Sequence, residues 1–122
     1  MPRFTREQHV RSGRDFAAIY AERHRAGDDT LLVFARRRSD DARRIGLSVS
    51  RKNGPAVRRN RIKRRLREAF RLSQSQLPTG YDWVLVPRPG TDPTLAEYRR
   101  SLERLTAKLD RRLRKQAAAD PR

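Results

Sequence analysis

Residues 51–71, RKNGPAVRRNRIKRRLREAFR, constrain the fold more than any other part of the chain. This segment carries ten Lys and Arg residues and a single carboxylate, Glu68. Its apolar residues nevertheless recur at helical spacing, so that Ile62, Leu66, Ala69 and Phe70 fall on one side of a helix. One side of this helix must therefore pack on a core, while every other side presents cations or polar groups.

A helix of this kind needs an anionic partner, because like charges at i,i+4 spacing destabilise it and only Glu68 could relieve them. The 122-residue chain has a net charge of +17, and its 27 arginines far outnumber its 4 lysines. Arginine presents a planar fork that suits phosphate oxygens. An acidic membrane surface is a weaker alternative, because the apolar stripe is committed to the core. The sequence therefore favours a nucleic-acid partner.

The length is enough for one compact domain. We expect residues 1–115 to form a single RNA-binding domain, with 1–11 as a basic arm and 116–122 as a disordered tail. The chain has no cysteine, which leaves no thiolate metal site and is compatible with a reducing compartment. No apolar run resembles a signal peptide or a membrane span, so we expect a soluble, cytoplasmic protein without a membrane partner.

Periodicity and turn residues divide the chain into an α+β pattern. The expected order is a helix, two strands, the basic helix, a third strand and a last helix, over residues 12–27, 30–36, 44–50, 55–76, 81–88 and from 92–94 onward. In the second strand, Ile45, Leu47 and Val49 alternate with smaller residues and predict a half-buried strand. We expect a hairpin between the first two strands, with the basic helix crossing from the second strand to the third.

Three aromatic residues are candidates for stacking on unpaired bases. Phe16 and Tyr20 lie on one face of the first helix, and Phe34 points away from Leu31 and Val33 on a strand that we expect at the sheet edge. Ordinary core packing is the alternative, above all for Phe16. Aromatic stacking on single-stranded nucleic acid stabilises binding by roughly 1–3 kcal/mol per base.

Candidates for protein-based catalysis are poor. The two histidines, His9 and His24, have no partner at metal-ligand spacing. The acidic pairs at 28–29 and 40–41 fall in expected turns, and Ser48 and Ser50 have no evident base. We therefore expect neither a catalytic residue nor a metal ligand in the protein itself.

The pattern KxGxAVxRNxxKRxxRE over residues 52–68 resembles the RNR signature of the protein subunits of bacterial ribonuclease P. Asp15-Phe16, the segment GLSVS (46–50) and a strand followed by Arg88 are similar to the family as well, and they occur in the family's order. Tyr20 stands where phenylalanine is common, and Pro87 where a small residue is more usual.

This resemblance implies a fold like that of ribosomal protein S5 domain 2, a two-layer sandwich with a left-handed βαβ crossover. It also implies an accessory subunit of the ribonucleoprotein that removes the 5′ leader from precursor tRNA. In that enzyme the RNA subunit is the catalyst, one protein is expected per catalytic RNA, and Mg²⁺ is held mainly by the RNA.

Positions that match the family's motifs carry its expected contacts. The residues expected to meet ribonuclease P RNA are Lys52, Arg59, Asn60, Arg61, Lys63, Arg64 and Arg67. The residues expected to line a cleft for the single-stranded leader are Phe16, Tyr20, Phe34, Ser48 and Ser50. The protein is expected to bind catalytic RNA and precursor tRNA and to lower the Mg²⁺ requirement.

Two other functions fit the charge. A general RNA-binding or ribosomal protein would have a similar composition and fold class, and only the ordered motif argues against it. A DNA-binding regulator would place the basic helix in a major groove, but charge surrounds this helix and no dimerisation element is evident.

Overall fold

The computed structural model describes residues 5–119. Its helices and strands are α1 (Gly13–Ala21), β1 (His24–Gly27), β2 (Leu31–Arg37), β3 (Arg43–Leu47), α2 (Ala56–Ser73), β4 (Tyr81–Pro87) and α3 (Leu95–Ala119). Short 3₁₀ turns lie at Arg6–Gln8, Arg51–Asn53 and Gln74–Gln76. The chain is therefore the α+β protein that the sequence predicts, with the basic helix as α2. None of the helices in this described range is long and apolar enough to cross a membrane.

The four strands form one sheet in the order β1-β2-β4-β3. Strand β4 pairs antiparallel with β2 and parallel with β3, so α2 is the crossover between parallel neighbours. The predicted crossover is confirmed. The predicted hairpin between β2 and β3 is wrong, because β4 lies between them, and Phe34 consequently lies on an inner strand and not at the sheet edge.

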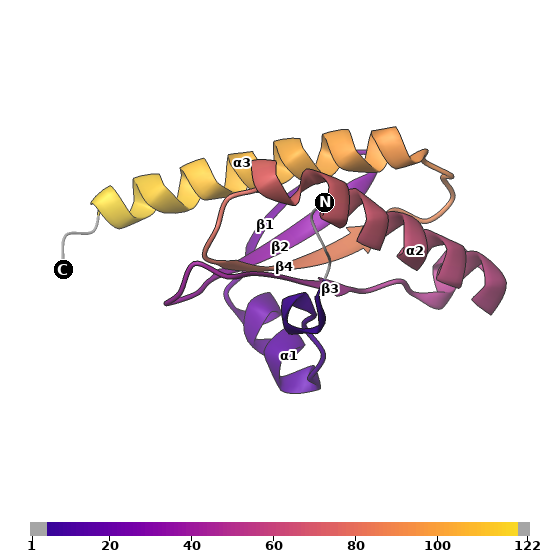
Figure 1. Cartoon of the computed structure of the whole chain (residues 1–122), viewed down its shortest axis with the longest axis horizontal. Coiled ribbons are helices and arrows are strands. Elements are labelled where there is room, and N and C mark those ends of the chain that lie inside the picture. Colours follow the sequence, from indigo (N-terminus) through magenta and orange to yellow (C-terminus); the bar gives the residue numbers. More distant parts are fainter. Residues whose placement is uncertain (1–4, 120–122) are drawn as a thin grey trace.

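Helices cover the two faces of the sheet unequally, as Figure 1 shows: α2 and α3 lie on one side and the short α1 on the other. The larger core lies under α2 and α3 and includes Leu31, Val33, Ile45 and Trp83. On the opposite face, Ile19 of α1 packs with Val84 of β4. Strand residues alternate between these faces, which is why β2 and β4 are apolar on both sides.

The apolar stripe of α2 is buried as predicted. Ile62, Leu66, Ala69 and Phe70 are at most 3% exposed. Helix α3 begins with a capping box, in which Thr94 and Glu97 exchange side-chain to backbone hydrogen bonds, as their spacing predicts.

The first helix ends earlier than predicted. It stops at Ala21, and Arg23 turns the chain with a positive φ of 58°. The next four residues form β1, which pairs with β2 along its whole length. Pairing with a neighbouring strand decided the conformation of this basic segment, because four residues cannot hold a strand by local propensity alone.

The N-terminal segment is more ordered than an irregular arm, although residues 1–4 lie outside the described range. His9 bridges to Ile45 of β3, and the Val10 amide donates to the Ile45 carbonyl at 2.8 Å. Gln8 reaches the side chain of Gln74 just beyond α2. At the other terminus, α3 continues through residues 116–119, which are exposed, and the remainder of the expected tail lies outside the described range.

Candidate nucleic-acid interface

Two arginines of α2 make hydrogen bonds to a neighbouring loop of the protein. Arg58 donates to the carbonyl of Thr91 at 2.7 Å, and Arg65 donates to Asp92 and to the carbonyl of Pro93 at 2.8 and 2.9 Å. All three partners lie in the loop that leads into α3. This flank of α2 therefore holds the helix against its neighbour.

Arg71 of α2 is paired with Glu68, but most other cations of α2, and Lys52 in the turn before it, are not neutralised by the described part of the protein. Five predicted residues have neither a hydrogen bond nor an ion pair within the described chain: Lys52, Arg61, Lys63, Arg64 and Arg67. Asn60 is exposed among them, and Arg59 donates only to the carbonyl of Gly54, at 3.2 Å. The predicted RNA-binding residues thus lie on the sides of α2 away from the core and in the turn before this helix, with Arg61 on the flank that carries Arg65.

An open groove of about 420 Å³ crosses the sheet edge at β3, between α1 and α2. Its lining residues come from the N-terminal segment, α1, β3 and α2: His9, Val10, Arg11, Phe16, Ile45, Gly46, Leu47, Lys63 and Arg67. The lining contains three cations and no carboxylate. It places an aromatic ring from α1 in the same groove as two cations from α2.

Glycine at position 46 allows the ring of Phe16 to lie directly on β3. A Cβ atom at this position would stand 2.6 Å from Cζ of Phe16 and 3.1 Å from the side chain of Val10. Both distances are too short for ordinary packing. The small residue in this strand therefore accommodates a side chain of the protein itself.

Phe16, Tyr20 and Phe34 form a continuous aromatic cluster between α1 and the sheet. The ring centroids of Phe16 and Tyr20 are 6.4 Å apart, and Tyr20 meets Phe34 edge-on at 4.8 Å. All three rings are half-buried and pack against the cluster of Val10, Ile19 and Val84. Only Phe16 lines the groove itself; the other two extend the aromatic surface along the sheet.

The two serines lie where β3 leads into α2. The Ser48 amide still donates to the carbonyl of Leu85 at 3.0 Å, although β3 ends at Leu47. Ser50 is exposed and precedes the 3₁₀ turn that carries Lys52. Neither serine lines the groove, so the structure does not bring them together with Phe16, Lys63 and Arg67.

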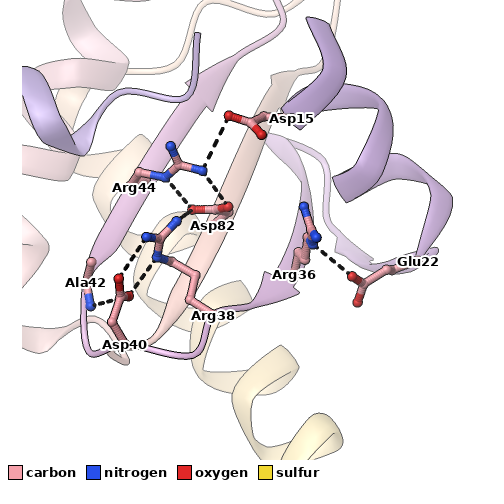
Figure 2. A network of polar contacts seen from close by, with 8 residues as sticks. All are labelled: Asp15, Glu22, Arg36, Arg38, Asp40, Ala42, Arg44 and Asp82. Carbon is pink, nitrogen blue, oxygen red and sulfur yellow. Dashed lines mark hydrogen bonds and ion pairs between the residues drawn. The ribbon is translucent and has the colours of Figure 1, made fainter. Parts of the chain in front are cut away.

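A buried carboxylate organises the end of the sheet beneath α1 (Figure 2). Asp82 of β4 is 2% exposed and accepts from Arg44 Nε and Nη2 at 2.8 and 2.9 Å and from Arg38 Nη1 at 3.0 Å. The Asp82 carboxylate raises the pKa of Arg44 above its ordinary value. Arg38 also holds Asp40, whose pKa its guanidinium lowers to about 2.

The same network links α1 to the sheet at both helix ends. Arg44 Nη2 lies 3.6 Å from Asp15 in the first turn of α1, and Arg36 Nε lies 3.1 Å from Glu22 just after its last turn. Figure 2 shows these two pairs near the two ends of the helix. Because α1 has only nine residues, these contacts help to set its position and hence that of Phe16 and Tyr20.

Sequence reasoning missed several of these residues. From sequence, the Arg-rich segment 36–44 is a polar loop that matches no motif. A single aspartate within the apolar run YDWVLVP is the signal that a charged partner lies beneath the sheet. His9 and Arg11 were assigned to an irregular arm. Burial, and then the charges of Arg11 and Arg67, lower the pKa of His9.

Comparison with known proteins identifies the family. The family model for ribonuclease P matches residues 4–110. The ribonuclease P protein component of Methylococcus capsulatus is 41% identical over 111 residues, which cover 89% of this chain and 86% of the relative. That of Thermotoga petrophila is 40% identical over 85 residues, covering 70% and 73%.

Solved structures agree with this assignment. The Staphylococcus aureus RNase P protein superimposes with a TM-score of 0.71 at 32% identity, covering 84% of this chain and 94% of that one. The Thermotoga maritima RNase P protein gives a TM-score of 0.70 at 32% identity, covering 80% and 96%. The predicted fold class is confirmed, and the chain belongs to the ribonuclease P protein component family.

Proposed function

We propose that this chain is the protein subunit of a ribonuclease P ribonucleoprotein and that it binds both the catalytic RNA and the 5′ leader of precursor tRNA. The observation that carries the proposal is the groove at β3, where Phe16 lies with Lys63 and Arg67. Single-stranded nucleic acid is bound by aromatic rings that stack on its bases and by cations that contact its phosphates, and this groove offers both.

The unpaired cations of α2 and of the turn before it contact the phosphate backbone of the catalytic RNA. Lys52, Arg61 and Arg64 point away from the protein core and have no carboxylate partner among the described residues. Cations placed between two RNA molecules offset the repulsion between their phosphates and release bound counterions. The complex then assembles at a lower Mg²⁺ concentration than the RNA alone requires.

The leader follows the aromatic cluster into the groove. Stacking on Phe16 and its neighbours and contacts with Lys63 and Arg67 involve ring faces and phosphates, which all nucleotides share. Binding therefore has little sequence preference. Because mature tRNA has no leader, these contacts favour the precursor and help to release the product.

Mg²⁺ is held by the RNA in this proposal. The groove lining offers cations and no carboxylate, which is the wrong donor set for a hard divalent cation. Among residues 5–119, no group of three or more His, Asp or Glu side chains could hold a metal ion. The protein's own residues contribute binding and orientation, in the cytoplasm where precursor tRNA is made.

The test is cleavage of precursor tRNA by a bacterial ribonuclease P RNA at low Mg²⁺, with and without the protein. We expect activation and a single cut at the mature 5′ end. Tight, salt-sensitive RNA binding without activation would instead identify a general RNA-binding protein. Equal affinity for precursor tRNA with and without its leader would contradict leader binding, and tighter binding to duplex DNA at equal salt would favour a DNA-binding regulator.

A further inference from the structure

Helix α3 carries a second set of cations that the proposed contacts do not use. Its exposed residues Arg100, Arg104, Lys108, Arg111 and Lys115 follow one another at spacings of three and four residues. At 100° per residue these positions fall on one side of the helix, opposite Leu102, Leu105 and Leu109. We call these five residues the α3 ridge, which is about 22 Å long.

Contacts on both flanks of α3 fix the direction of this ridge. On one flank, Arg99 donates to Ser73 of α2 at 3.0 Å. On the other, Arg112 Nη1 donates to the carbonyl of Arg25 in β1 at 2.8 Å. The ridge lies between these flanks and therefore points outward from the helical layer.

The charges in the second half of the ridge are not neutralised. Lys108, Arg111 and Lys115 have no hydrogen bond or ion pair in the described chain, whereas Arg104 is paired with Asp28. Asp110, the one acidic residue of α3 after Glu103, is engaged by Tyr81 at 2.7 Å and by Arg114 at 3.0 Å. Repulsion at i,i+3 and i,i+4 spacing is thus unrelieved, as it is on α2.

Helix stability does not account for the position of these cations. A lysine or arginine in the last turn stabilises the helix dipole, but Lys108 and Arg111 lie two to three turns before the end at Ala119. Figure 1 shows this half of α3 running past the end of the sheet. Residues 114–119 are all exposed there.

The ridge and the groove lie toward opposite edges of the sheet. Helix α3 packs on β1 and β2, whereas the groove crosses β3. The outer strands β1 and β3 are separated by three inter-strand spacings, about 14 Å. A partner that contacts both surfaces must extend over this distance, and the catalytic RNA of the proposed function is a large polyanion that can do so.

We propose that the α3 ridge is a second phosphate-binding surface for ribonuclease P RNA, separate from α2 and centred on Lys108, Arg111 and Lys115. This inference rests on the proposed function for the identity of the RNA. It commits to the sugar-phosphate backbone as ligand, because the ridge offers cations without an aromatic side chain or a base-reading amide.

The test compares the wild type with the variant K108A/R111A/K115A and with the charge-preserving variant K108R/R111K/K115R. Binding to a bacterial ribonuclease P RNA is measured across a series of salt concentrations. We expect the alanine variant to bind about tenfold more weakly at moderate salt, with the slope of log Kd against log salt reduced by about 2. The charge-preserving variant should match the wild type, and neither variant should change the affinity ratio between precursor tRNA with and without a leader.

A wild-type salt slope in the alanine variant would overturn the inference, and so would a loss confined to precursor tRNA. Loss of thermal stability without a change in slope would show that the cations serve only the helix. Failure of the wild type to activate cleavage would reject the proposed function instead, while the salt slope would still report whether the ridge binds RNA.

Discussion

Arginine serves opposite purposes in two regions of this molecule. Beneath α1, Arg36, Arg38 and Arg44 are bound to carboxylates at distances near 3 Å. Around α2, Arg61 and Arg64 have no such partner in the described chain, although the helix is just as rich in arginine. The first group positions a helix, and the second is available to an external anion.

Pairing, and not charge density, separates a structural arginine from one that is available to bind an anion. Asp82 is buried, and it would be costly to bury if Arg38 and Arg44 did not hydrogen-bond to it. Among the described residues, the carboxylate on the outer side of α2 is that of Glu68, and it is paired with Arg71, so Arg61 and Arg64 have no carboxylate partner there. Phosphate groups of RNA can supply the missing charge there.

Replacing Asp82 with asparagine should have the largest effect, because two arginines lose their shared carboxylate. We expect the free energy of unfolding to fall by about 2–3 kcal/mol, since both arginines keep some access to water. Thermal unfolding followed by the fluorescence of Trp83, the one tryptophan of the chain, measures this loss. Asp41→Asn in the adjacent exposed loop is the matched control and should leave stability unchanged.

Replacing Phe16 with alanine should cost about 1–2 kcal/mol of leader-dependent binding. The measurement is the affinity of the assembled holoenzyme for precursor tRNA with and without its leader. Phe16→Leu retains apolar bulk against Gly46 and controls for packing, but it lacks a ring face. An equal loss with both substrates would mean that the ring is only a core residue.

Adjacent arginines on α2 provide the sharpest test of the comparison. Arg64→Ala should weaken RNA binding by about 1 kcal/mol and reduce the salt slope by nearly one unit, with no loss of stability. Arg65→Ala removes the contacts to Asp92 and Pro93, so it should lower stability by up to about 1 kcal/mol and leave RNA binding intact. If Arg64→Ala lowered stability and Arg65→Ala weakened RNA binding, the distinction between paired, structural arginines and unpaired, binding arginines would be wrong.

The smallest expected effect concerns pH. The pKa of His9 in the folded protein is lowered by burial and by the charges of Arg11 and Arg67. As pH drops below about 6.5, His9 is therefore protonated more readily in the unfolded chain than in the folded one, and the stability of the free protein falls. A phosphate of bound RNA in the groove offsets the charges of these cations and raises the pKa of His9. Because protonation of His9 then favours the complex, RNA affinity should increase a few-fold as pH falls from 7.5 to 6. His9→Gln should abolish this dependence.

His24→Gln is the control for the pH experiment, because His24 is the other histidine of the chain and lies on β1, away from the groove. The variant should retain the wild-type pH dependence of RNA affinity. If the pH dependence disappeared in this variant, the group responsible for it would lie on β1 and not in the groove.

Much of the interface could be predicted from sequence because it depends on one helix. The spacing of Ile62, Leu66, Ala69 and Phe70 identifies the buried side of α2, and the helical period then assigns every cation to a flank or to the outer face. The aromatic residues Phe16 and Tyr20 could be grouped for the same reason. Local periodicity carries this information without knowledge of the partner elements.

The arrangement of the strands and the pairing of charges needed the tertiary structure. Strand β1 exists because β2 hydrogen-bonds to it, and β4 enters between β2 and β3 although it follows them by more than thirty residues. Likewise, only long-range contacts reveal that Arg44 is committed to Asp82, 38 positions away, while Arg64 is not. Sequence alone determined which residues are cationic and which face of each helix is apolar. The tertiary structure decided which of these cations have partners, because pairing depends on distances between segments that no local pattern encodes.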